Sequence, residues 1–214
     1  NQLEVVRWRD EIREGTKKRT KGRAIHFADF SHAQKRFAIQ CLYKKPVRFT
    51  AAISNKREVP KDTFTSKSQL YFYITRYVIE RISWFCRDVR PRVTEGDGRV
   101  KIIFSRRGGM SYNDFSEYMI RLQSDPEATI HWPVIDVSAI EAQDHSRLAG
   151  LQLADCGARA ISEAFEPDLF GNIEAQYLEQ LRERIYQRNG NFLSYGLKLL
   201  PHADRWFYQH HKPQ

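Results

Sequence analysis

A single carboxylate, Asp155, lies in a segment that is made mostly of small and apolar residues. The segment reads Gly150-Leu-Gln-Leu-Ala-Asp155 and continues as Cys-Gly-Ala-Arg-Ala160. An ionised carboxylate taken out of water needs a cation, a cluster of hydrogen-bond donors or a raised pKa. The segment itself predicts a closely packed helix with Asp155 on the edge of its apolar face, because apolar residues recur at spacings of three and four: Leu148, Leu151, Ala154, Ala158 and Ile161.

Two further carboxylates are candidates to share a site with Asp155. Glu80 lies inside the longest helical pattern of the chain, and Asp136 ends a strand-like segment. Carboxylates that meet at strand ends would form a site for Mg²⁺ or Mn²⁺, hard cations that prefer oxygen ligands. The structural alternatives are an intrahelical ion pair of Glu80, which lies next to Arg81 and four residues from Arg76, and a turn or cap formed by Asp136. Both interpretations stay open.

Several basic residues are candidates to bind a phosphate. The loop Ser105-Arg-Arg-Gly-Gly109 precedes a helix start, so Arg106, Arg107 and free backbone amides could converge on an anion. A glycine turn with two solvated arginines is the equal alternative. Lys56 ends another strand and is either a phosphate ligand or simply exposed. His26 lies in a short extended stretch, where its imidazole is either a general base or an interior hydrogen-bond partner.

The charge balance favours an anionic partner. The chain has 35 Lys and Arg against 26 Asp and Glu, a formal charge of +9, which attracts nucleic acid foremost. The loop 16–23 is strongly basic and could contact phosphates, although a solvated loop is the alternative. The sequence contains no nucleophile elbow, zincin helix, EF-hand loop or paired-cysteine zinc motif.

The composition is that of a globular protein without a membrane anchor. No apolar run reaches the roughly 18 residues of a membrane span, and the first residues show no signal peptide. We therefore expect a soluble, cytoplasmic protein. Cys41, Cys86 and Cys156 are odd in number and far apart, so we expect core thiols and not a disulfide framework or a zinc site.

The order of elements predicts an α/β fold with parallel strands. We expect one domain over 1–214, made of a helix and basic loop at 1–23, a core at 24–201 and a polar tail at 202–214. The expected strands are 47–54, 100–104 and 129–137, and 192–200 either pairs or lies across the surface. The expected helices are 3–14, 31–42 capped by Ser31, 66–88, 112–122 capped by Ser111, the Asp155 helix, and 173–187 capped by Asn172.

Four segments together resemble a known family. They are Ile25-His-Phe-Ala-Asp-Phe30, Arg48-Phe-Thr-Ala-Ala-Ile-Ser-Asn-Lys56, Leu70-Tyr-Phe-Tyr-Ile-Thr-Arg-Tyr-Val-Ile-Glu-Arg81 and Gly150-Leu-Gln-Leu-Ala-Asp155. Over about 25–201 the chain resembles the bacterial and phage family called domain of unknown function 3800 (DUF3800), which has a ribonuclease H-like fold. The Gly-Leu-Gln-Leu-Ala-Asp segment is the most specific of the four.

The resemblance implies a mixed central sheet flanked by helices, with a carboxylate cluster that binds two divalent metals and hydrolyses a phosphodiester. Asp155 would be the acidic residue of the last core helix, and Glu80 that of the first long one. The family's opening strand, with its Asp-Glu-Ser-Gly motif, has no match here, and we expect it to be missing from this chain. Ser105 also stands where ribonuclease H-like nucleases have an aspartate.

The expected function is therefore a metal-dependent nuclease acting on DNA or RNA with Mg²⁺ or Mn²⁺. The alternative is a catalytically inactive module with a degenerate nuclease fold, which binds nucleic acid or a protein partner. A homo-oligomer is also compatible with the sequence.

Overall fold

The computed structural model describes residues 2–16, 24–60, 63–64, 66–92 and 96–200. The predictions for the basic loop at 17–23 and for the polar tail at 202–214 lie outside these residues. Contacts divide the chain into two compact units, each built from three segments. The first unit consists of 1–49, 103–108 and 141–185, and the second of 50–102, 109–140 and 186–214. A single functional domain stays a prediction.

The described residues form a mixed α/β structure with six α-helices and two parallel sheets of two strands each. The helices are α1 (Gln2–Gly15), α2 (His32–Tyr43), α3 (Lys67–Val89), α4 (Tyr112–Leu122), α5 (Ala149–Ser162) and α6 (Gln176–Leu181). The strands are β1 (Ala51–Ser54), β2 (Ile103–Ser105), β3 (Glu141–Gln143) and β4 (Leu197–Leu200). Both strand pairs run parallel, as predicted.

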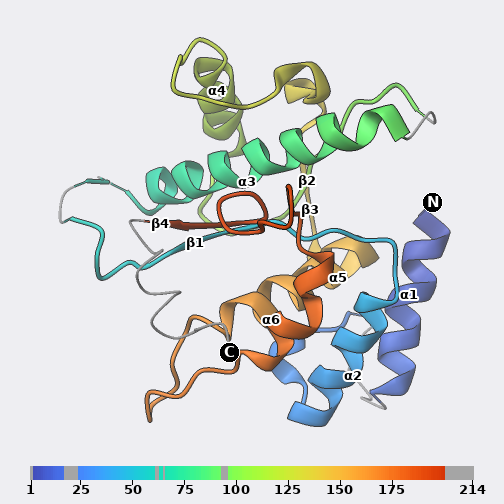
Figure 1. Ribbon diagram of the computed structural model, residues 1–214. Coiled ribbons are helices and arrows are strands. Elements are labelled where there is room, and N and C mark those ends of the chain that lie inside the picture. Colours follow the sequence, from blue (N-terminus) through green and yellow to red (C-terminus); the bar gives the residue numbers. More distant parts are fainter. Residues whose placement is uncertain (1, 17–23, 61–62, 65, 93–95, 201–214) are drawn as a thin grey trace. The chain divides into compact units, whose positions relative to one another are not determined.

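The first unit contains four helices, three of which pack around α5, and the strand pair β2–β3, whose strand β2 also contacts α5. α1, α2 and α6 all contact α5, and α2 also packs on α1 and α6 (Figure 1). Close packing on α5 depends on its small residues: a Cβ added to Gly157 would lie 2.2 Å from Cε1 of Phe49. The core of this unit is apolar and almost fully buried, and it includes Ile12, Ile25, Phe27, Ile39, Leu42, Leu153, Cys156, Tyr177 and Leu181.

The second unit places the long helix α3 against the pair β1–β4 (Figure 1). The two strands are in register from Ala51 opposite Leu197 to Ser54 opposite Leu200. α3 also contacts α4, so its wide apolar stripe is covered on more than one side.

The helix caps follow the sequence closely. Ser31 and Gln34 form a reciprocal capping box at the start of α2. The Ser111 side chain accepts the Asp114 amide at the start of α4, and Ser66 caps α3 by accepting the Gln69 amide. These helix starts confirm the predicted ones to within a residue, because a cap needs only residues that are close in sequence.

Two predicted elements are wrong. Residues 129–137 form two 3₁₀ turns, Trp132–Val134 and Val137–Ala139, and only Ile135 makes a bridge, to Val100. Pro133 lacks an amide for a ladder, and Asp136 begins a turn by accepting the Ser138 amide. The predicted helix 173–187 is shortened to α6, because Asn172 closes a separate turn with Asp168 and does not cap it.

The described part of the chain contains no helix that is both long and apolar enough to cross a bilayer. All three cysteines are free thiols, as expected. Cys41 and Cys156 are buried, and Cys86 is half-buried.

Candidate metal site

Two polar side chains of α5, Gln152 and Asp155, hold one extended stretch of backbone. Gln152 Oε1 accepts the amide of Ile25 at 3.0 Å, and Asp155 Oδ2 accepts the amide of Phe27 at 3.2 Å. His26 between them is extended, with φ −129° and ψ 122°. Alternate amides of an extended chain point to the same side, and residues three apart lie on one helix face. Gln152 and Asp155, three residues apart on the helix, can therefore accept two alternate amides of one extended stretch of backbone.

His145 reaches the same stretch from the turn before α5. Asp144 caps that turn by accepting the Ser146 amide at 2.8 Å, and this hydrogen-bonded turn fixes the backbone at His145. Nε2 of His145 lies 3.2 Å from the carbonyl oxygen of Ile25. A carbonyl can only accept, so this hydrogen bond requires the proton on Nε2 and leaves the lone pair of a neutral imidazole on Nδ1.

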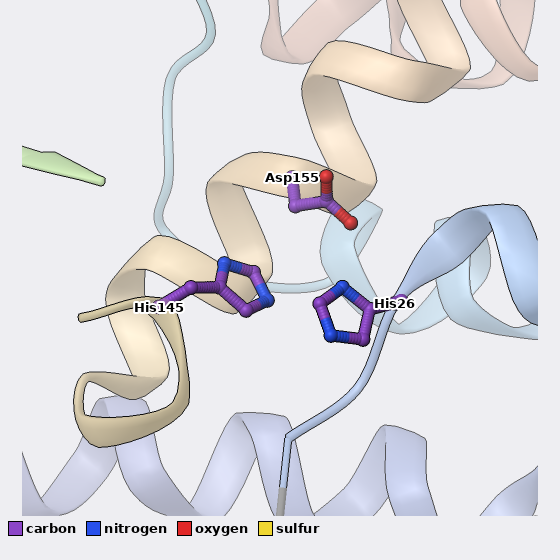
Figure 2. A group of neighbouring side chains, drawn as sticks. All are labelled: His26, His145 and Asp155. Carbon is purple, nitrogen blue, oxygen red and sulfur yellow. The ribbon is translucent and has the colours of Figure 1, made fainter. Parts of the chain in front are cut away.

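His26, His145 and Asp155 lie next to one another (Figure 2). The two imidazole rings are stacked, with centroids 4.5 Å apart and an angle of 16° between their planes. One ligand atom of each of the three residues lies within 4.8 Å of the others. His26 is exposed, and His145 and Asp155 are half-buried, so the site opens to solvent on one side. It is the one group of three or more metal-ligand side chains that the described residues bring together.

Two imidazoles and a carboxylate are a common ligand set for divalent transition metals. Metal bonds of about 2.0–2.2 Å place neighbouring ligand atoms roughly 3–3.5 Å apart, so side-chain rotations would have to draw the three residues together. Two of the three ligands already have the second hydrogen bond that metal ligands usually make. His145 donates to a carbonyl and Asp155 accepts an amide, as the outer partners of metal ligands do. The donor set therefore fits a bound divalent ion.

Glu80 lies in the second unit, where it is almost fully buried within α3. Among the described residues its Oε2 has no hydrogen-bond partner, and it forms an ion pair with Nη1 of Arg81 at 3.7 Å. Burial raises the pKa of Glu80, an effect that Arg81, Arg76 and Lys198 only partly offset. This ion pair with Arg81, within α3, is in line with the structural alternative, whereas Arg76 pairs with Asp125 at 3.2 Å.

Asp136, also in the second unit, acts as a cap, in line with the structural alternative. It accepts the amide and hydroxyl of Ser138 and pairs with Arg99 at 3.2 Å. The Ser138 hydroxyl is the main reason that the pKa of Asp136 lies below its usual value. The assignment of Glu80 and Asp136 as metal ligands stays a prediction.

The predicted phosphate ligands divide between the two units. Lys56 is exposed in the turn after β1, in the second unit. Arg106 and Arg107 are exposed after β2, in the same unit as Asp155. The Arg106 amide donates to Gln143 at 2.8 Å, so this arginine lies beside the segment that leads into His145. Its charge also contributes, after the Ser146 hydrogen bonds and Arg147, to the lowered pKa of Asp144.

The structure thus brings together Asp155 and His26 from the predicted set, and it adds two residues that the sequence did not single out. His145 lies in a short turn with no helical or strand periodicity, and Gln152 lies within the most specific segment of the resemblance. Their place before and within the Asp155 helix is the signal that could have identified them.

Comparison of the chain with protein-family models, with curated protein sequences and with solved structures finds no match in any of the three.

Proposed function

We propose that this chain is a metal-dependent nuclease with a ribonuclease H-like fold, which hydrolyses phosphodiester bonds in DNA or RNA. The observation that carries the proposal is the convergence of His26, His145 and Asp155 within 4.8 Å. The resemblance to the DUF3800 family supports the same chemistry, since it implies metal-assisted phosphodiester hydrolysis at the Asp155 helix. The formal charge of +9 supports an anionic polymer as the substrate.

The proposed metal ligands are Nδ1 of His145, an oxygen of Asp155 and a nitrogen of His26. Two nitrogen donors favour Mn²⁺ over Mg²⁺ among the cations expected from the sequence. A bound divalent ion would activate a water molecule and polarise the phosphoryl group.

The surrounding residues have separate tasks in this proposal. The Asp155 carboxylate supplies the negative charge that retains the cation, and the Phe27 amide fixes one of its oxygens. Arg106, at the segment before His145, would neutralise charge on the phosphate oxygens. The exposed position of His26 leaves the open side of the site to substrate and water.

The test is a cleavage assay with single-stranded and double-stranded DNA and RNA, in Mn²⁺, in Mg²⁺ and in EDTA. We expect cleavage with Mn²⁺ that EDTA abolishes and that Asp155→Asn and His145→Gln reduce at least about a hundredfold. His145→Gln is a sharp variant, because its amide can still donate to Ile25 while the Nδ1 ligand is lost. Cleavage that survives EDTA or both substitutions would overturn the proposal, and so would inactivity of the unsubstituted chain.

A second function, nucleic-acid binding without cleavage, is favoured by Arg106 and Arg107, which are exposed in the same unit as the candidate site. It predicts salt-dependent binding that metal removal leaves unchanged. Inactivity together with such binding would select this function.

A further inference from the structure

Gln152 is a fully buried polar side chain beneath the candidate metal site. Its exposed fraction is 0%. An amide buried this deeply is costly unless its hydrogen-bonding groups find partners. Both the oxygen and the nitrogen of the Gln152 carboxamide form hydrogen bonds. Oε1 accepts from the Ile25 amide at 3.0 Å and from Arg9 Nη1 at 3.5 Å, and Nε2 donates to the carbonyls of His145 at 3.2 Å and Ser146 at 3.3 Å.

Three of these four partners belong to the two backbone segments that carry the imidazoles. Ile25 directly precedes His26, and the carbonyl on the other side is that of His145 itself. One carboxamide therefore bridges segments that lie 127 and 7 residues from it along the chain. The His145 side chain closes the arrangement by donating to the Ile25 carbonyl.

We infer that Gln152 is a positioning residue for the metal site, which sets the spacing of His26 and His145 before an ion binds. The inference rests on the proposed metal site and deepens it. Only a group with an acceptor at one end and a donor at the other satisfies both segments, so the chemistry selects glutamine at this length. Outer-sphere partners of this kind typically contribute 10–100-fold to metal affinity.

Two substitutions separate the positioning role from simple packing. Gln152→Met keeps the length of the side chain and removes both hydrogen-bonding ends. Gln152→Glu keeps an acceptor for Ile25 and Arg9 but faces the carbonyls of His145 and Ser146 with an oxygen. Gln180→Met is the matched control, since Gln180 lies in the same unit, is half-buried, and has an Oε1 without a hydrogen-bond partner among the described residues.

The experiment is a titration of the metal-free chain with Co²⁺, followed by its visible absorption, alongside circular dichroism of each variant. We expect Gln152→Met and Gln152→Glu to bind Co²⁺ about 10–100-fold more weakly, with an altered spectrum, while they stay folded at the titration temperature. Gln180→Met should bind like the unsubstituted chain. A merely structural role would lower thermal stability and leave the affinity and spectrum of the folded protein unchanged.

The possible outcomes distinguish failure of the Gln152 inference from failure of the metal site itself. Unchanged Co²⁺ affinity and spectrum in the folded Gln152 variants would overturn the inference and leave the metal site intact. Absence of Co²⁺ binding by the unsubstituted chain would overturn the metal site and the inference with it. If one variant does not fold, the other decides, and unfolding of both while Gln180→Met folds would overturn a positioning role in favour of a purely structural one.

Discussion

Asp155 Oδ2 accepts the backbone amide of Phe27 at 3.2 Å, across 128 residues of sequence. The carboxylate therefore has two tasks: it holds the extended stretch that carries His26, and one of its oxygens lies within 4.8 Å of a ring nitrogen of each imidazole. The Phe27 amide satisfies one oxygen of the carboxylate but does not neutralise its negative charge.

The two tasks of Asp155 are separable by substitution. Asp155→Asn keeps an acceptor for the Phe27 amide and removes the charge, whereas Asp155→Ala removes both. We expect both variants to lose divalent metal binding, and only Asp155→Ala to lose about 1–2 kcal/mol of unfolding free energy in metal-free buffer. Denaturant unfolding and metal titration measure the two effects. Equal stability of the two variants would contradict the role assigned to the Phe27 bond.

The ligand set also predicts which cations bind. Because two of the three proposed ligands are imidazoles, Mn²⁺, Co²⁺ and Zn²⁺ should bind at least about tenfold more tightly than Mg²⁺. Competition titrations against a coloured chelator would measure this ratio. His26→Ala should reduce the ratio of transition-metal affinity to Mg²⁺ affinity. A site that binds Mg²⁺ more tightly than these metals would show that the imidazoles are not ligands.

The packing of α5 predicts opposite effects for its two glycines. Gly157→Ala would press a methyl group against Phe49, with a first contact of 2.2 Å, and should destabilise the chain by about 1–3 kcal/mol. Gly150→Ala meets only Val5 Cγ1 at 3.9 Å, so the gain in helix propensity should stabilise by up to about 1 kcal/mol. Thermal unfolding of the pair tests the packing, and a stable Gly157→Ala would contradict it.

Glu80 predicts a specific pH dependence. Its pKa in the folded chain is raised by burial, so the folded state holds the proton more tightly than the unfolded chain, where the pKa is about 4.3. The free energy of unfolding should therefore fall as pH rises from the unfolded pKa through the folded one. Glu80→Gln resembles the protonated acid and should match the unsubstituted chain near pH 4, but be more stable at pH 7, on the order of 1 kcal/mol.

The control for Glu80 is Glu117→Gln, which removes an exposed partner of Arg121 at 3.9 Å and should change stability little at any pH. Urea unfolding from pH 4 to pH 8 gives the comparison. A stability difference between Glu80→Gln and the unsubstituted chain that is the same at every pH would show that Glu80 does not titrate in this range.

Arg106 should contribute to nucleic-acid binding through charge. Arg106→Ala should weaken binding equally for different sequences and reduce the slope of log K against log salt by about 0.7–0.9, the value of one phosphate contact. Arg121→Ala, an exposed arginine of α4, is the control with an unchanged slope. An unchanged slope for Arg106→Ala would remove this residue from the proposed phosphate contacts.

Several helices were predictable because caps and apolar periodicity depend only on residues that are close in sequence. Ser31 and Ser111 identified two helix starts, and the apolar stripe of 66–88 predicted α3. The predicted strand at 129–137 and the predicted cap at Asn172 failed because turns form at these positions. Pro133 and the Asp136 cap turn 129–137 away from a strand, and Asn172 binds Asp168 instead of capping a helix. Turn chemistry here prevails over strand and helix propensity.

The candidate site was predictable only in part, because its key contacts join distant segments. His26 and Asp155 were identified from residue type and context. His145 and Gln152 act through the backbone of Ile25, and no periodicity in the sequence reports such a contact. Glu80 was a candidate because it could meet Asp155 and because the resemblance matches it to the acid of the first long helix, but neither reason reveals which neighbours surround it.

The most direct test is X-ray absorption spectroscopy of the chain loaded with Co²⁺ or Zn²⁺. Two imidazole nitrogens from His26 and His145, together with oxygen ligands that include Asp155, should form the coordination shell, and His145→Gln should leave one imidazole. A chain that binds no ion, or that binds one through oxygen atoms alone, would contradict the account.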